Sequence, residues 1–174
     1  MRDLIIGALA IAGAACAAPT NTTTTPTTAT TATTISAEFS VLNPRDYQSF
    51  VGAWTPEDRP LCAVFASATD WVRQLHPAAL MGARNVFAPP GTLWNNHAVL
   101  FLARIANGGD PASVFQITGV TRGAGETVVD YTFTNPPTAT YTQRAYFAVA
   151  VEKPLTGVVR FRENGQVVCE ATAG

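Results

Sequence analysis

Residues 158–171 read VVRFRENGQVVCEA, two short β-branched runs on either side of Asn164-Gly165. Asn-Gly is the strongest short signal for a hairpin, because a type I′ turn needs positive φ at both central residues. A two-residue turn pairs Phe161 with Val168 and Arg160 with Cys169. This register places Cys169 on the less apolar face of the hairpin, unless a bulge shifts it. The segment predicts two antiparallel strands at the end of the chain.

Strand patterns continue upstream of this hairpin. The nearly unbroken apolar run 97–105 is typical of a strand that is covered on both faces. Residues 114–121 and 127–134 flank a Gly-Ala-Gly turn and predict a second hairpin. Residues 144–151 alternate again, with apolar side chains at every second position. The C-terminal two thirds of the chain is therefore expected to be rich in strands.

Helical signals are fewer and lie nearer the N-terminus. Ser67 is a candidate N-cap that opens a helix ended by Pro77, with Trp71 and Leu75 on one face. Residues 43–52 resemble a second helix start. Shorter apolar runs before each of these helices, at 39–42 and 61–66, read as strands. We therefore predict an α+β, mostly β fold: an antiparallel sheet of about six or seven strands with one or two short helices packed on it.

The first 35 residues differ from the rest of the chain. Residues 1–15 contain an apolar run that is typical of a secretory signal and falls short of the roughly 20 residues of a membrane span. Residues 20–34 contain eleven Thr in fifteen positions and offer too little apolar surface to offset the entropy of ordering. We expect a signal peptide over 1–15, a disordered tether over 16–35 and a single globular domain over 36–174.

The sequence leaves two cleavage routes open. Gly13-Ala14-Ala15-Cys16 resembles a bacterial lipobox, which would make Cys16 the lipidated N-terminus of a membrane-anchored envelope protein. Cleavage after Ala17 or Ala18 would instead release a soluble periplasmic or secreted protein. We favour the lipid anchor. Both routes leave Cys62 and Cys169, which an oxidising compartment would join in a disulfide, and the alternative is two unpaired buried thiols.

Composition excludes some classes of function. The chain has 174 residues and a formal net charge of −1, with eleven basic and twelve acidic residues. These charges are scattered, so the chain offers no basic face for a nucleic acid. Three Cys and two His leave little material for a metal centre. We expect neither a metal nor a cofactor, and no nucleic acid partner.

Catalytic motifs are also missing from the sequence. It contains no Gly-x-Ser-x-Gly elbow, His-Glu-x-x-His, phosphate loop or Cys-x-x-Cys. His76 and His97 could act as a base near neutral pH, although each reads more simply as a polar residue at the end of an element. His97 could converge with Asp110 and Ser113, but their spacing does not require it. We expect a non-catalytic protein, and a pocket holding His97 beside an acid would favour an enzyme instead.

A family resemblance rests on five features in order. They are AVFASATDW at 63–71, the buried strand from 97, a Gly-Gly loop leading into VFQI at 114–117, YTFTNP at 131–136 and FAVAVEK at 147–153. In this order they resemble the C-terminal domain family of PrcB, lipoproteins that stabilise protease complexes. The resemblance implies a non-catalytic envelope protein that docks on another protein. Departures from the family pattern fall in loops, so the identity of the partner stays open.

Candidate partner-binding residues lie in one loop and on nearby aromatic side chains. The loop from Asn135 to Tyr141 reads NPPTATY and is similar to a loop of the chagasin-like inhibitors, so the alternative function is a protease inhibitor that inserts this loop. The surface aromatics of the chain could serve as binding anchors. The candidates are Trp94, Pro136, Pro137, Tyr141 and Tyr146.

Overall fold

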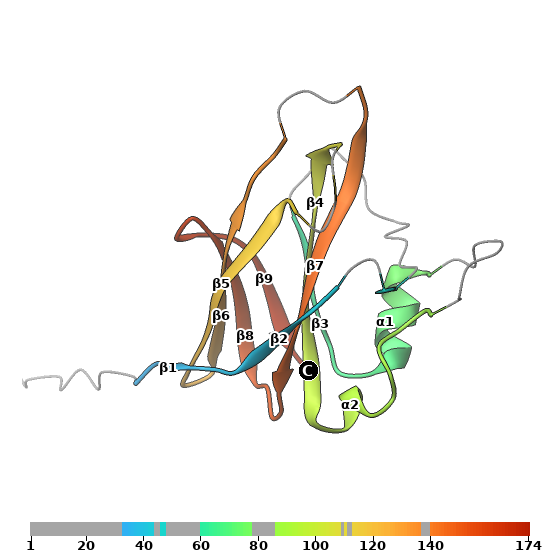
Figure 1. Ribbon diagram of the computed structural model, residues 1–174. Coiled ribbons are helices and arrows are strands. Elements are labelled where there is room, and N and C mark those ends of the chain that lie inside the picture. The colour runs from blue at the N-terminus through green and yellow to red at the C-terminus, as the bar shows by residue number, and fades with distance from the viewer. Residues whose placement is uncertain are drawn as a thin grey trace, which may run out of the picture. The chain divides into compact units, whose positions relative to one another are not determined.

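The described part of the chain forms two β-sheets and two short helices in a computed structural model (Figure 1). All of the described residues belong to one compact unit that begins at Ala32. Cys16, the expected signal peptide and most of the expected tether lie outside the described residues. Among the described helices, none is long and apolar enough to cross a membrane. The structure describes residues 33–43, 46–47, 60–77, 86–108, 110, 113–136 and 140–174.

The first sheet has five strands in the order β1-β5-β6-β8-β9. Neighbouring strands are antiparallel except β6 and β8, which run parallel. The parallel pair arises because the strand between them in the sequence, β7, lies in the other sheet. The strands are β1 (Ile35–Ser36), β5 (Phe115–Gly123), β6 (Glu126–Phe133), β8 (Gly157–Glu163) and β9 (Gln166–Ala173).

The second sheet has four antiparallel strands in the order β2-β7-β4-β3. Its centre is the pairing of β4 with β7, which runs from His97 opposite Glu152 to Asn107 opposite Thr142. The strands are β2 (Phe39–Leu42), β3 (Leu61–Phe65), β4 (His97–Asn107) and β7 (Thr142–Glu152). The mostly β prediction is therefore confirmed, with nine strands in two sheets in place of the single sheet of six or seven.

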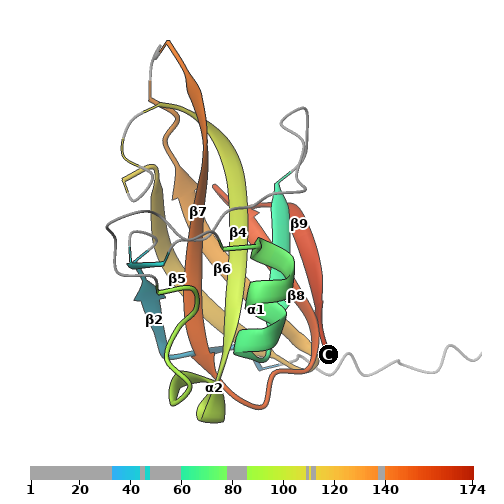
Figure 2. The same ribbon diagram turned by 90° about the vertical axis from the view of Figure 1, so that its right-hand side faces the viewer.

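The two sheets pack face to face, and the four-stranded sheet is covered on both sides. Along β4, Leu100 and Leu102 face the five-stranded sheet, whereas Val99 and Phe101 face the helices. All four side chains are fully buried, which confirms the expected doubly covered strand. Figure 2 shows α1 in front of β4, with the strands of the other sheet behind. This second cover explains why both faces of β4 and β7 are apolar.

Helix α1 (Ala68–Leu75) begins and ends as its sequence predicts. The Ser67 hydroxyl accepts a hydrogen bond of 3.1 Å from the backbone N–H of Asp70, which satisfies one of the free donors of the first turn. The helix ends at His76, whose φ of 46° is left-handed. Trp71 and Leu75 are buried on its inner face. A second helix, α2 (Leu93–Asn96), precedes β4.

Replacement of Ser67 by Ala should lower the free energy of unfolding by about 0.5–2 kcal/mol, because the cap of α1 is lost. Thr69→Ala is the matched control, since Thr69 is exposed within the same helix. That substitution should leave stability unchanged or raise it slightly. Urea denaturation monitored by circular dichroism compares the two variants. Equal stability of both would show that the cap contributes nothing.

The β8–β9 hairpin has the predicted turn but a different register. Asn164 and Gly165 have φ values of 50° and 84°, as the type I′ turn requires. An irregularity between Phe161 and Arg162 pairs Phe161 with Cys169 rather than with Val168. One extra residue on a strand rotates the side chains that follow it. Cys169 therefore lies on the apolar face, and its predicted place on the less apolar face is wrong.

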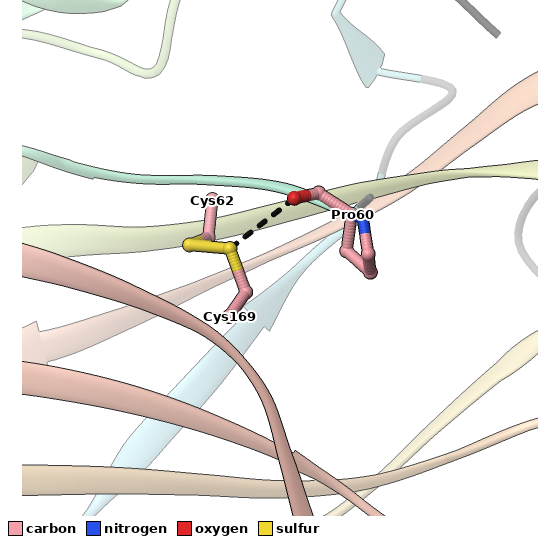
Figure 3. The surroundings of a disulfide bond; sticks show 3 residues. All are labelled: Pro60, Cys62 and Cys169. Carbon is pink, nitrogen blue, oxygen red and sulfur yellow. Dashed lines mark hydrogen bonds between the residues drawn. A yellow bond between two sulfur atoms is a disulfide. The ribbon is translucent and has the colours of Figure 1, made fainter. Parts of the chain in front are cut away.

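A disulfide joins Cys62 of β3 to Cys169 of β9, as the cysteine count predicts. Figure 3 shows the bridge. It links the two sheets covalently at the side of the domain where β3 and β9 are in contact. Both cysteines pack against the core between the sheets. The Sγ atom of Cys169 lies 3.2 Å from the carbonyl oxygen of Pro60, a contact in which the bridged sulfur has no proton to donate.

The boundary between tether and domain also needs correction. Ile35, the last residue of the expected tether, pairs with Arg122 of β5. The hydroxyl of Thr34 also lies close to Gly123 of β5, where an added Cβ atom would stand 3.7 Å from it. The sheet therefore reaches the end of the Thr-rich stretch. The predicted helix start over 43–52 lies mostly outside the described residues, although Tyr47 contacts Trp71 edge to face.

A polar network joins the two sheets inside the packed domain. Arg104 of β4 forms an ion pair with Glu163 of β8, and the hydroxyl of Tyr131 donates a 3.0 Å hydrogen bond to the same carboxylate. The Arg104 guanidinium also lies 4.4 Å from the ring centroid of Phe133. Burial of the hydroxyl is the main cause that raises the pKa of Tyr131, and the negative charge of Glu163 raises this pKa further. The hydroxyl therefore stays protonated and serves as a donor.

Candidate functional site

The side of the domain opposite the disulfide is formed by β1 and β2. β1 is the edge strand of the five-stranded sheet and β2 the edge strand of the four-stranded sheet. Only two residues, Ala37 and Glu38, connect them, so the chain crosses from one sheet to the other at this side (Figure 1). The N–H of Ala37 donates to the carbonyl of Val120 and fixes the crossing.

This crossing segment, which we call the β1–β2 edge (Ile35–Leu42), exposes apolar side chains. Ile35, Phe39 and Val41 are 60%, 36% and 56% exposed. They make up half of the six exposed large hydrophobic side chains in the described part of the chain. The outer backbone of an edge strand also carries unpaired N–H and C=O groups. β2 itself, Phe-Ser-Val-Leu, has none of the charged or proline residues that usually protect such an edge.

A pocket of about 370 Å³ lies beside β2, on the face of its sheet that carries the helices. His97 stands opposite Glu152 across the β4–β7 pair. Glu38 immediately precedes the β2–β7 ladder, which starts with Phe39 opposite Val151, so continuing the register sets Glu38 beside Glu152. The three side chains form one row across the sheet. The pocket is lined by Glu38, Phe39, Ser40, His97, Ala150 and Glu152.

The pocket has a negative rim made by two carboxylates, Glu38 and Glu152. The Glu38 and Glu152 carboxylates form no ion pair with any described residue. Two described basic side chains close to Glu152 already have partners: Arg122 donates to the backbone carbonyl of Glu152 itself, and Lys153 donates to the carbonyls of Ala66 and Trp94 at 3.0 and 2.8 Å. The site therefore attracts a positively charged group.

The ring of His97, a residue that lines this pocket, carries an unsatisfied polar atom. Its Nδ1 is buried and has no hydrogen-bond partner among the described residues. A buried polar atom without a partner is uncommon in a native protein.

The arrangement brings His97 beside one acid, Glu152, with Glu38 one strand further away, and it does not assemble an activated serine. Ser40 lies on β2 and His97 on β4, with β7 between them. Two strand spacings amount to about 10 Å, whereas a nucleophile and its base need hydrogen-bond contact. Ser40 and His97 are therefore not a nucleophile–base pair, although a pocket that holds His97 beside an acid is the feature named above as favouring an enzyme.

The proposed convergence of His97 with Asp110 and Ser113 is wrong. His97 begins β4, and the other two follow its far end, about 33 Å away for an eleven-residue strand. Ser113 instead donates to the carbonyl of Asp110 through both its N–H and its hydroxyl, within the loop. His76 lies at the end of α1.

Two of the five candidate partner-binding residues are buried. Trp94 is 8% exposed, and its indole N–H donates to the carbonyl of Pro89 at 3.0 Å. Tyr146 is 6% exposed and stacks on Phe101 with 5.1 Å between ring centroids. Both pack in the layer between the helices and the sheet. The expectation that these rings are surface anchors is therefore corrected.

The other three candidates belong to the loop between β6 and β7. Tyr141 is 57% exposed, and Pro136 is half-buried. Pro137 lies outside the described residues. The side-chain oxygen of Asn135 accepts a 2.7 Å hydrogen bond from the N–H of Asn107, so the start of the loop is anchored to the end of β4. This loop lies at the opposite end of β4 from the pocket.

Sequence reasoning did not find the β1–β2 edge as a site. The short apolar run at 39–42 correctly indicated a strand there. Exposure depends on which strand ends each sheet, however, and that order follows from the packing of distant strands. The pocket likewise needs β2, β7 and β4 side by side.

These features define a class of protein: a two-sheet β domain with short helices on one face, a disulfide along one side and an open, apolar strand edge along the other. Comparison with protein-family models, with curated proteins and with solved structures found no match.

Proposed function

We propose that the chain is a non-catalytic bacterial envelope protein, exported and lipid-anchored through Cys16, that binds and stabilises a partner protein. The observation that carries the proposal is the β1–β2 edge, where Ile35, Phe39 and Val41 are exposed on the edge strands of the two sheets. Exposed apolar clusters of this kind often mark interaction surfaces. The resemblance to the PrcB family suggests a protease complex as the partner.

Two further features support export and anchoring. The Cys62–Cys169 disulfide is typical of a protein that matures in an oxidising compartment. The lipobox-like segment before Cys16 and the Thr-rich stretch after it would hold the domain away from a membrane surface. A soluble periplasmic or secreted protein is the alternative, and it requires cleavage after Ala17 or Ala18.

Deletion of the gene should lower the abundance of one envelope protein several-fold, and wild-type chain should restore it. Cys16→Ser should move the chain from the membrane pellet to the soluble fraction and restore the partner less well, because the anchor is lost. Quantitative proteomics of the envelope measures both effects. An unchanged envelope proteome would contradict the stabilising role, and an intact N-terminus in the cytosol would contradict export.

Loop insertion into a protease remains the second candidate function, because Tyr141 is exposed in a loop anchored by Asn135. Such an inhibitor should block a protease in a purified assay. Replacement of Pro136 and Pro137 by Ala should then abolish inhibition without lowering stability. A chain that stabilises its partner and inhibits no protease would rule this candidate out.

A further inference from the structure

The outer edge of β2 can accept another strand. β2 ends its sheet, and its residues Phe39, Ser40 and Val41 are exposed. Binding by strand addition joins the main chains through hydrogen bonds, while pockets for alternate side chains provide specificity. Here the two faces of β2 differ, so they select different side chains.

One face of β2 continues the row of charged residues in the pocket. An added strand would lie about 5 Å from β2, and its residue opposite Glu38 would extend the row that already contains Glu152 and His97. Opposite charges across neighbouring strands attract. A Lys or Arg at this position would meet two carboxylates that have no ion-pair partner among the described residues.

The other face of β2 favours apolar residues. Phe39 and Val41 stand opposite Val151 and Val149 of β7, both of which belong to the core between the sheets. Phe39 and Val41 are themselves exposed. Apolar residues on the same face of an added strand would cover them and extend that core.

We infer that β2 binds an extended segment of a partner protein as an additional strand, in which apolar residues alternate with a Lys or Arg that enters the pocket of Glu38, Glu152 and His97. This inference rests on the proposed function and specifies its binding surface. The partner segment therefore alternates along its length. Apolar side chains lie on one face of the added strand, and the Lys or Arg lies on the other.

Two other occupants lack the required charge. A second copy of the β1–β2 edge would bring Glu38 and no cation. The chain's own Thr-rich stretch, residues 20–34, contains neither Lys nor Arg. The unpaired carboxylates therefore favour a basic segment from another protein over both.

The inference is tested by NMR spectroscopy. The ¹⁵N-labelled full chain is titrated with the peptide acetyl-Thr-Val-Lys-Val-Thr-amide, and the chemical shifts of its backbone amides are recorded. We expect amide shifts centred on Phe39–Leu42 and the facing residues of β7. Glu38→Gln and Glu152→Gln should each weaken binding about two- to fivefold, the range of one cross-strand charge pair. Glu170→Gln is the matched control, because Glu170 is exposed on β9 at the other side of the domain, and it should bind like wild type.

Two control peptides separate the contributions. Replacing the peptide's Lys by Glu should abolish binding, and methylating its backbone nitrogens should do the same by removing the strand's donors. The inference is overturned if the Glu peptide binds equally, if the shifts centre on β9, or if no shift appears at millimolar peptide. Two further results would overturn it. Chemical shifts of β2 that change on dilution would show that β2 contacts a second copy of the chain. Nuclear Overhauser effects between β2 and residues 20–34 would show that β2 contacts the chain's own Thr-rich stretch.

The outcome can be distinguished from that of the proposed function. If the Glu38→Gln, Glu152→Gln double variant restores partner abundance fully in the deletion strain, the partner binds elsewhere and only the inference fails. If the peptide binds as expected but deletion changes no envelope protein, the surface is correct and the stabilising role fails.

Discussion

Removal of the Cys62–Cys169 disulfide should lower the free energy of unfolding by about 2–5 kcal/mol. The bridge spans 107 residues, and on the chain-entropy model a loop of this length restricts the unfolded state by somewhat under 5 kcal/mol. It also joins the edge strands of two sheets. Denaturant unfolding of Cys62→Ala, of Cys169→Ala and of the double variant measures the effect.

The three variants provide their own control. Either single replacement breaks the bridge, so the double variant should be destabilised little more than each single one. Additive losses would show that each side chain acts separately through packing. If dithiothreitol leaves the free energy of unfolding of the wild-type chain unchanged, the disulfide does not make the expected contribution to stability.

Replacement of Trp71 by Ala should lower the free energy of unfolding by about 3–5 kcal/mol. The Trp71 side chain is fully buried and lies edge to face with Phe65 and Phe101, at centroid distances of 5.4 and 6.0 Å. Its indole N–H donates to the carbonyl of Phe87 at 2.9 Å. The substitution leaves a cavity and also removes the donor for that carbonyl.

Two further substitutions calibrate this result. Val72→Ala changes the next residue of the same helix, which is 41% exposed, and should cost less than about 1 kcal/mol. Trp71→Phe keeps an aromatic ring but loses the N–H, so its cost should lie between the two. Urea unfolding compares all three, and equal costs for Trp71→Ala and Val72→Ala would show that α1 does not pack on the sheet as described.

Local signals in the sequence were sufficient for the individual elements. The cap at Ser67, the turn at Asn164-Gly165 and the apolar run of β4 each depend on neighbouring residues, and the structure confirms all three. The disulfide followed from counting cysteines in a chain whose sequence predicts export. Such features need no knowledge of which strands meet.

Tertiary packing determined the rest. The bulge in β9 turns Cys169 towards the core, where it reaches Cys62, and no turn signal specifies that shift. Tyr146 was placed at the surface because only one face of its strand was expected to be covered, but the helices cover the other face. The pocket at Glu38 likewise depends on strands that are distant in sequence.

We propose that this domain contacts a partner protein through the β1–β2 edge, and the other proposals about its function depend on that contact. A photocrosslinking amino acid at Val41, compared with one at Val72, tests it most directly in the envelope of the cells that make the protein. Both positions are exposed, so they differ mainly in location. We expect one adduct with a different envelope protein from Val41 and none from Val72. Equal adducts from both positions, or an adduct of two copies of this chain, would contradict it.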